Sequence, residues 1–333
     1  MFDAQWKSML NDVLSEGKLV DRKEGRSFRE LISYQFKIDD PRDRLIFNKN
    51  FGLNIFQYVG QFLWITQGSH DAEAMEYYAP YSKRYSTDQI RMIGAYGPRL
   101  FGIHHLNQIQ YVIDTLDEDE TKRRAVASIY LPQFDQHKFT DEVPCTLNLQ
   151  YLVREKKVHK VTYMRSQNAY RLLPLDVFLF TMLQEYVNAV LTTGHDTTLG
   201  NYNHHSGSFH VYIDEIPLIK NALEDNTNYS AKMEPMPSKN IKLRIPRLNK
   251  FESLVRTTIS AHEMRKKPVN FDFLFETLED WFKEKYWKQL ALLLVCYGTI
   301  IMKDDKYLQQ ATKMLDPIYQ YFVQLYLDRS KTA

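Results

Sequence analysis

The chain has 333 residues, of which 44% are hydrophobic and 25% charged, and its formal net charge is +2. This composition excludes an intrinsically disordered chain and a strongly basic tail, so we expect no nucleic-acid partner. Two cysteines are too few for a disulfide framework, which indicates a reducing, cytoplasmic location. The longest apolar run, residues 290–302, is bounded by charges and is too short for a membrane span, so it predicts a buried helix and no membrane partner.

The first third of the chain predicts mainly helices. Apolar spacing and turn residues give a helix over 2–15, a basic loop and strand over 21–38, a buried helix over 53–68, a helix over 106–116 and a strand from 125. Gly94, Gly97 and Pro98 predict an irregular loop around Tyr96.

Two strands and one helix are predicted at the centre of the chain. Residues 145–154 and 158–164 alternate apolar with polar side chains and are separated by a lysine-rich turn, which is typical of paired strands. After Pro174 the apolar residues change to helical spacing, and this helix is expected to end at Gly194.

The last third predicts a connection followed by helices. Residues 224–246 contain three prolines and indicate a long connection with a short edge strand. From Phe251 onward the pattern is helical, with Asp304 or Asp305 capping the last helix and Pro317 kinking or breaking it.

A set of short motifs stands in a fixed order in the middle of the chain. They are Pro144–Cys145, Gln150 five residues later, Arg165–Ser166 twenty residues after the cysteine, Leu173-Pro174-x-Asp176, and Gly207-Ser208-x-His210-x-Tyr212. In order and spacing they resemble thymidylate synthases and their pyrimidine nucleotide hydroxymethylase relatives. The segments LPLD and FTMLQE are most similar to the branch that hydroxymethylates cytidylate or deoxycytidylate (CMP or dCMP). The resemblance covers residues 21–212 and extends to about residue 246.

The resemblance implies a fold and a division of the chain. The expected fold is α+β, with a large twisted mixed sheet flanked by helices. Residues 1–246 would form the catalytic domain, and residues 247–333 a helical C-terminal extension packed on it.

Cys145 is the candidate nucleophile. Addition of its thiolate to C6 of a pyrimidine makes C5 reactive towards a one-carbon unit. A thiolate forms at neutral pH only near positive charge, and Arg165, expected on the neighbouring strand, would lower the pKa. A lone strand cysteine is more often an inert core residue, and Cys296 in its apolar helix is read that way; the surrounding motifs favour a catalytic role for Cys145 alone.

The implied substrate is a pyrimidine nucleoside monophosphate bound by a homodimer. Arg165 and Ser166 suit phosphate oxygens, and the resemblance adds Arg22 from the same chain and Arg123 and Arg124 from the partner chain. It also makes Gln150, His210 and Tyr212 substrate contacts, the last two at the sugar 3′-hydroxyl. The alternatives are a solvated basic turn for the arginine pair and ordinary packing for the histidine and tyrosine.

Asp176 stands where thymidylate synthases carry the asparagine that reads uracil. The carboxylate of Asp176 can accept a hydrogen bond from the cytosine amino group, and when protonated it can donate one to N3. The same carboxylate would leave O4 of uracil without a hydrogen-bond donor. The residue therefore favours a cytosine base and a catalytic role. The simpler alternative is that Asp176 caps the helix that follows Pro174.

The implied cofactor is methylene-tetrahydrofolate, and no metal is expected. The resemblance assigns Trp64 and Asn168 to the cofactor site and Tyr96 to a proton relay. Gln61 replaces a glutamate that relays protons, and glutamine cannot exchange a proton. Asn168 replaces an aspartate that contacts the pterin.

Three hypotheses follow. The first is a homodimeric hydroxymethylase of CMP or dCMP; its polar C-terminus, LDRSKTA, does not exclude water as an apolar tail would, which favours hydroxymethyl over methyl product. The second is a nucleotide-binding homologue without folate turnover, motivated by Gln61 and Asn168. The third is a methylase or hydroxymethylase of uridylate. The sequence does not decide whether the sugar of the substrate nucleotide is ribose or deoxyribose.

Overall fold

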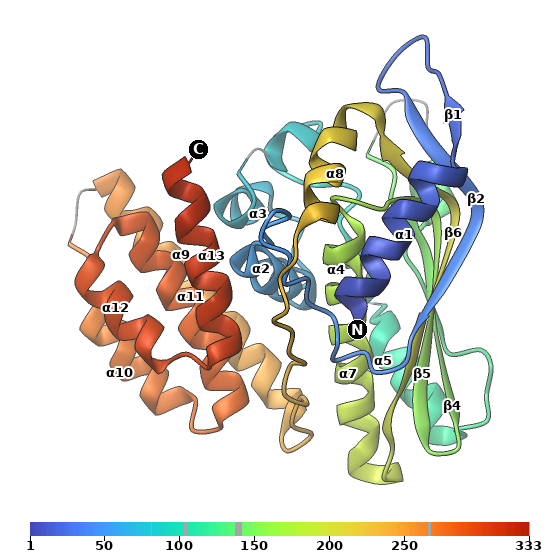
Figure 1. The fold of residues 1–333 in the computed structure, drawn as a ribbon. Coiled ribbons are helices and arrows are strands. Elements are labelled where there is room, and N and C mark those ends of the chain that lie inside the picture. Colours follow the sequence, from blue (N-terminus) through green and yellow to red (C-terminus); the bar gives the residue numbers. More distant parts are fainter. Residues whose placement is uncertain (81, 103–105, 137–141, 266–267, 333) are drawn as a thin grey trace. The chain divides into compact units, whose positions relative to one another are not determined.

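The computed structural model describes residues 1–80, 82–102, 106–136, 142–265 and 268–332 (Figure 1). Contacts group the chain into two compact units. The first consists of Met1–Leu53 and Gly102–Ser238, and the second of Asn54–Phe101 and Lys239–Ala333. Each unit is therefore discontinuous in sequence. The division into a catalytic domain and an extension at residue 246 stays a prediction.

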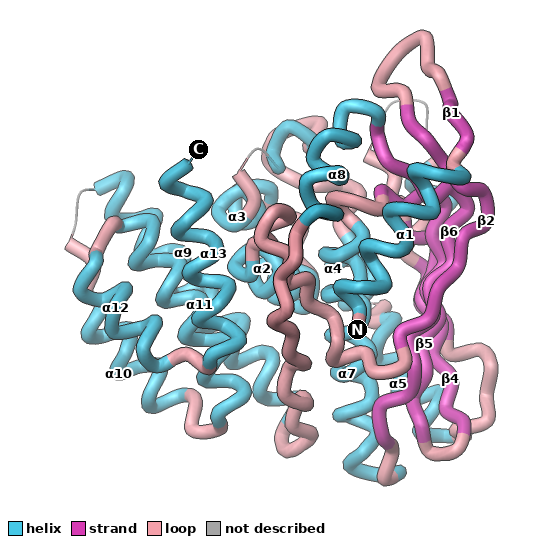
Figure 2. The backbone as a smooth tube through the Cα atoms, viewed as in Figure 1, coloured by secondary structure: helices cyan, strands magenta, loops and turns pink. Residues whose placement is uncertain are grey.

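A six-stranded mixed sheet organises the first unit (Figure 2). Its strands follow the order β1 (Lys18–Val20), β2 (Phe28–Ile38), β6 (Thr198–Tyr212), β5 (Lys157–Asn168), β4 (Thr146–Arg154) and β3 (Val126–Ser128). Only β5 and β6 are parallel among these neighbours. The predicted strands over 21–38, 145–154 and 158–164 are confirmed as β2, β4 and β5.

Helix α7 (Leu173–His195) connects the two parallel strands, because a parallel pair needs a crossover. Pro174 lies in its first turn, where the missing N–H costs no helical hydrogen bond. The helix ends at His195 and is followed by the capping residue Asp196, whose backbone is left-handed with φ of 49°. The helix predicted after Pro174 is thus confirmed.

One face of the sheet is buried and the other is not. Alternate residues of β5, such as Val158, Lys160 and Thr162, are buried, while their neighbours His159 and Val161 are partly exposed. Helices α1 (Phe2–Glu16), α5 (Gln108–Glu118) and α7 lie on the buried side (Figure 1). The partly exposed side chains of β5, such as His159 and Val161, lie on the opposite face.

The buried side of β6 carries a line of polar side chains. The hydroxyl of Tyr202 lies 2.8 Å from His204 Nδ1, and His204 Nε2 lies 3.1 Å from Ser206 Oγ. His204 is fully buried, and burial lowers its pKa to about 3, so the ring is neutral. These hydrogen bonds satisfy polar groups that the core would otherwise leave unpaired.

The first unit closes with short helices and an irregular connection. The remaining elements are α6 (Pro132–Asp135), the 3-10 turn Ile213–Glu215 and α8 (Ile216–Glu224). Residues 225–238 form neither helix nor strand. The edge strand predicted within 224–246 is wrong, because Ile241 begins a helix that contains Pro246 near its start.

The second unit is helical. Its elements are α2 (Ile55–Thr66), α3 (Ala72–Tyr78), the 3-10 turn Ser82–Tyr85, α4 (Tyr96–Phe101), α9 (Ile241–Arg265), α10 (Phe271–Trp281), α11 (Lys285–Met302), α12 (Asp305–Met314) and α13 (Pro317–Thr332). The apolar run predicted as a buried helix is confirmed as α11, which packs against α9 and α12. Asp304 caps α12, and Pro317 begins α13, so the predicted break is confirmed.

Tyr96 was expected in a loop, and this prediction is wrong. It is the first residue of α4, and Gly97 and Pro98 follow it in the first turn of this helix. A Cβ atom at Gly97 would lie 2.8 Å from the carbonyl oxygen of Ser69, which leaves room only for glycine. Across the described ranges, no helix is both long enough and apolar enough to cross a bilayer.

Candidate active site

Cys145 lies directly before β4, next to an irregularity in the sheet. The pairing of β4 with β5 shifts between Thr146 and Asn148, and such bulges re-aim side chains. The carbonyl oxygen of Cys145 accepts from the backbone N–H of Arg165 on β5 at 2.9 Å. The cysteine is a partly exposed free thiol, so it is not packed into the core as Cys296 is.

The side chain of Arg165 turns back to the segment before the cysteine. Its Nε donates to the carbonyl oxygen of Pro144 at 3.0 Å, and one terminal nitrogen donates to that of Val143 at 2.9 Å. The sequence interpretation placed this guanidinium beside the thiol, and the structure brings the two residues together as expected. Through these hydrogen bonds Arg165 also holds the backbone segment that precedes Cys145.

The pKa of the Cys145 thiol is raised, contrary to the expectation that Arg165 would lower it. Burial is the largest cause; the charge of Arg165 opposes it, and the nearby carboxylate of Asp176 reinforces it. The arginine therefore acts in the predicted direction, but desolvation of the thiolate outweighs it.

Asp176 lies in the first turn of α7 and does not cap the helix. The capping position is Leu172, and the carboxylate instead accepts from the side-chain amide of Gln167 on β5 at 2.9 Å. The capping alternative is therefore wrong. Burial raises the pKa of Asp176 to about 7, although the hydrogen bond from Gln167 opposes the shift. A carboxyl group with this pKa exists in both protonation states near neutral pH.

Ser166 and His210 lie side by side on β5 and β6. The serine Oγ is 3.5 Å from His210 Nδ1, and burial lowers the pKa of the histidine, which keeps its ring neutral. Tyr212 follows at the end of β6, with its ring 5.1 Å from that of His210. The residues predicted to bind phosphate and sugar are thus adjacent.

The basic loop between β1 and β2 contributes a different arginine from the one predicted to matter. Arg22 is exposed there, and its backbone N–H is 3.3 Å from Ser27 Oγ. Arg26 instead lies 3.8 Å above the ring of Tyr212 and binds both oxygens of Asp214. Sequence reasoning assigned Arg26 no role, because nothing local in the sequence reveals its distant partners.

Asn168 is used inside the first unit. Its amide nitrogen donates to Glu215 at 2.8 Å, and its oxygen accepts from the backbone N–H of Arg171 at 2.6 Å. Glu215 is fully buried and also pairs with Arg171. Sequence reasoning missed Glu215, since its role appears only when β6 returns beside β5.

The pair of exposed arginines lies next to Gln150. The amide of Gln150 donates to the carbonyl oxygen of Arg123 at 2.9 Å, which fixes the approach to β3. Arg124 lies 3.9 Å from Glu118, a loose exposed pair, and within the described chain Arg123 forms no ion pair. Both side chains therefore remain accessible for an external anion.

The other three candidates belong to the second unit. Gln61 and Trp64 are one turn apart on α2; Gln61 is partly exposed, and its side chain has no hydrogen bond within the described ranges. The indole of Trp64 is buried and donates to the carbonyl oxygen of Asp71 at 3.0 Å. Tyr96 begins α4 and is partly exposed.

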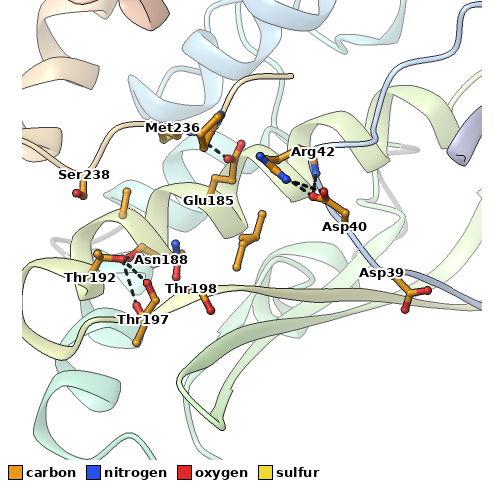
Figure 3. Close-up of a pocket in the computed structure, with 13 residues that line it drawn as sticks. Asp39, Asp40, Arg42, Glu185, Asn188, Thr192, Thr197, Thr198, Met236 and Ser238 are labelled. Carbon is orange, nitrogen blue, oxygen red and sulfur yellow. Dashed lines mark hydrogen bonds and ion pairs between the residues drawn. The ribbon is translucent and has the colours of Figure 1, made fainter. Parts of the chain in front are cut away.

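A cavity of about 520 Å³ lies near the C-terminal end of α7, away from Asp176. Its lining includes Glu185, Asn188 and Thr192 and none of the predicted site residues (Figure 3). Glu185 is buried; it forms an ion pair with the fully buried Arg44 and accepts from the backbone N–H of Met236 at 3.1 Å. These contacts tie the irregular connection to α7.

Comparison with known proteins identifies the family. The profile described as Thymidylate synthase matches residues 4–259. The chain belongs to the thymidylate synthase family. The α+β architecture with a mixed sheet flanked by helices, predicted from the motifs, is therefore confirmed as the thymidylate synthase fold.

Members of this family that resemble the chain include two phage proteins named deoxyuridylate hydroxymethyltransferase. The Delftia phage PhiW-14 protein is 31% identical over 219 residues, which cover 62% of this chain and 57% of that protein. The Bacillus phage SP01 protein is 27% identical over 222 residues, with 63% and 57% covered. Thymidylate synthase 1 of Bacillus spizizenii is 24% identical over 242 residues, with 67% and 84% covered. The match thus spans little more than half the length of the phage relatives.

Proposed function

We propose that this thymidylate synthase family member transfers a one-carbon unit to C5 of a pyrimidine nucleoside monophosphate, with Cys145 as the nucleophile. The observation that carries the proposal is the grouping of a partly exposed thiol with Arg165 and Asp176, whose charges both act on it. This grouping supplies the nucleophile, a cation and a base-reading carboxyl within one unit.

The residues have distinct roles in the proposed reaction. The thiolate of Cys145 adds to C6, and electrons of the C5–C6 double bond move towards C5 and N3. A proton held by Asp176 at N3 stabilises the negative charge of this adduct. Loss of the C5 proton and later expulsion of the thiolate restore the ring after the one-carbon unit is attached.

Methylene-tetrahydrofolate, which the family uses, would supply the one-carbon unit. The residues assigned to it fit only in part. Gln61 is partly exposed, its amide has no hydrogen-bond partner among the residues that the structure describes, and it suits a polar contact, whereas both polar ends of Asn168 already have partners in Glu215 and Arg171. Trp64 offers little surface, since it is 7% exposed. Gln61 is therefore the candidate contact.

We propose CMP or dCMP as the substrate and a hydroxymethyl group as the product. Asp176 supports a cytosine base, because one carboxyl group in its neutral form donates to N3 and accepts from the amino group. The two phage relatives are named for deoxyuridylate, which makes uridylate methylation or hydroxymethylation the second candidate. A nucleotide-binding homologue without folate turnover is the third, and the engaged side chain of Asn168 favours it.

The phosphate would be bound by Arg22, Arg165 and Ser166, with Arg123 and Arg124 contributed by the partner chain of a homodimer. His210 and Tyr212 would hold the sugar 3′-hydroxyl, and Gln150 would support this end of the site. Tyr96 is proposed as a proton relay. The exposure of both arginines and the partly exposed side chains on the second face of the sheet support a dimer.

The proposed function is tested by mass spectrometry of the nucleotide. Purified protein with the folate, formaldehyde and each of CMP, dCMP, UMP and dUMP is expected to add one hydroxymethyl group to a cytosine nucleotide. Cys145→Ser should abolish the gain, while Cys296→Ser, which changes a buried thiol of α11, should retain it. A gain only on uracil nucleotides selects the second candidate, and nucleotide binding without any gain selects the third.

A further inference from the structure

The side chain of Gln167 fixes the orientation of the base-reading carboxyl group. Gln167 is 1% exposed on β5, and its Nε2 lies 2.9 Å from Asp176 Oδ2 and 3.3 Å from the carbonyl oxygen of Asn168. Two acceptors around one nitrogen identify it as the amide donor. Its own Oε1 is buried without a hydrogen bond among the described residues, so the arrangement leaves one polar atom unsatisfied in order to hold Asp176.

We propose that Gln167 is a specificity-determining positioning residue: by donating to Oδ2 of Asp176, it confines the exchangeable proton to Oδ1, and this arrangement selects cytosine over uracil. The proposal rests on the proposed function, since it concerns the base that the site binds. It assigns Gln167 no contact with the substrate.

The selection follows from matching donors with acceptors. With the proton on Oδ1, the neutral carboxyl donates to N3 of cytosine, and Oδ2 accepts both from Gln167 and from the cytosine amino group. Uracil would place its N3–H donor against the Oδ1–H donor. It would also place its O4 acceptor against the Oδ2 acceptor, so neither contact forms a hydrogen bond. Uracil pairs only after the proton moves to Oδ2, the oxygen that Gln167 reserves as an acceptor. Binding uracil would leave buried polar groups without partners, and this cost discriminates strongly between the two bases.

The charges that surround Asp176 agree with this arrangement. The carboxylate of Asp176 acts on two ionisable groups of other segments, the Cys145 thiol before β4 and the Tyr202 phenol on β6. Neither is a cation, and the described residues give Asp176 no ion pair. The amide of Gln167 is therefore the group that favours the ionised carboxylate, against the burial that favours the neutral one.

The first arm of the test needs no substrate. In full-length protein with ¹³C-labelled aspartate carboxyls, Asp176→Asn identifies the Asp176 resonance, and its titration midpoint is followed by NMR. Gln167→Met, similar in volume but without a donor, is expected to raise the midpoint by roughly one pH unit, which is tenfold in the dissociation constant. An unchanged midpoint overturns the proposal, whatever the enzyme's activity.

The second arm measures calorimetric affinities for CMP and UMP, and for dCMP and dUMP, without folate. Gln167→Met should reduce the ratio of cytosine to uracil affinity about tenfold, whereas loss of packing alone would weaken both bases equally. Gln110→Met is the matched control, since Gln110 also donates to an aspartate, Asp114, at 2.6 Å but on the exposed surface of α5. Its ratio should equal that of the wild type.

Gln167→Leu, which also lacks a donor, serves as the second variant if Gln167→Met does not fold, as judged by its circular dichroism. It should change the ratio and the midpoint in the same directions. A ratio that stays constant in a folded variant overturns the proposal. A shifted midpoint and ratio with no product from any nucleotide would leave the proposal standing and refute the proposed function.

Discussion

The backbone N–H of Arg165 donates to the carbonyl oxygen of Cys145 at 2.9 Å, and the guanidinium of the same residue donates to the two residues that precede the cysteine. One residue thus holds the segment of Cys145 at three points while its charge lowers the pKa of the thiol against the effect of burial. The position of Cys145 and the pKa of its thiol therefore both depend on Arg165.

Removing the charge of Arg165 should make Cys145 less reactive. Arg165→Met is expected to raise the thiol pKa further and to slow alkylation by iodoacetamide several-fold at pH 8, because the thiolate is the reacting species. Arg165→Lys keeps the charge and should stay closer to the wild type. The measurement is made in a Cys296→Ala background, so that only Cys145 reports. Equal or faster alkylation in Arg165→Met across the pH range contradicts the electrostatic role.

Nucleotide binding should depend on pH through Asp176. Because burial raises the pKa of this carboxyl to about 7, the neutral form, which is proposed to pair with cytosine, is lost as the pH rises above 7. Affinity for CMP or dCMP is then expected to fall about tenfold per pH unit in the alkaline limb. Calorimetry on Asp176→Asn, which has no titrating proton there, should show no such fall. A wild-type affinity that is constant from pH 6 to 9 refutes the assignment.

Acid should destabilise the fold through His204. Its pKa is about 3 in the folded state, whereas an unperturbed histidine titrates near 6.5, so the unfolded chain binds the extra proton between these values. The free energy of unfolding therefore decreases as the pH falls from about 6.5 to 3, by an amount on the order of a few kcal/mol. Denaturant titrations of His204→Asn should show a smaller decrease in unfolding free energy than the wild type. The control His70→Asn, which changes an exposed histidine, should show the same decrease as the wild type. Identical pH profiles for all three proteins argue against this linkage.

The buried ion pair between Arg44 and Glu185 should be costly to break from one side. Arg44→Met leaves the glutamate buried beside an apolar side chain, with an expected loss of about 3–5 kcal/mol of unfolding free energy. Adding Glu185→Gln removes the unpaired charge and should recover part of the loss, because the amide oxygen still accepts from Met236. The midpoints of urea unfolding give both values. A double variant less stable than Arg44→Met contradicts the explanation.

The proposed dimer predicts complementation between inactive chains. Cys145→Ser chains mixed with Arg123→Ser/Arg124→Ser chains should regain activity after subunit exchange, since one site of each mixed dimer combines an intact cysteine with intact arginines. Random pairing gives about a quarter of the wild-type activity. Light scattering checks the oligomeric state. A monomer, or mixtures as inactive as their components, removes the shared site.

Local patterns predicted the elements that support the site, and distant pairings escaped them. The alternation in β5 and the apolar spacing of α7 correctly placed Arg165 on a strand and Asp176 on a helix, whereas Cys145, expected on a strand, lies one residue before β4. The same reasoning gave Asp176 a capping alternative, because a residue close behind Pro174 gives no sign of a partner on the preceding strand. The bond to Gln167, nine residues earlier, joins the end of β5 to the first turn of α7.

The errors share this origin. The prolines of residues 224–246 suggested an edge strand, yet Ile241 already begins α9, where tertiary packing tolerates Pro246. Arg26 and Glu215 were missed because their partners lie far apart along the chain. The raised pKa of Cys145 was missed because a short motif does not show how deeply a residue is buried. Burial raises this pKa more than the charge of Arg165 lowers it.

The pairing of β2 with β6 constrains how this protein folds while it is synthesised on the ribosome. Ile38 of β2 is paired with Tyr202 of β6. The ribosome must therefore add roughly 160 residues after β2 before its partner strand exists, which takes on the order of 10–30 s. Throughout that interval one edge of β2 has no strand beside it, and the nascent polypeptide is open to mispairing with other chains. Slower translation through residues 39–197 would lengthen this exposure, so soluble yield should be sensitive to codon choice there.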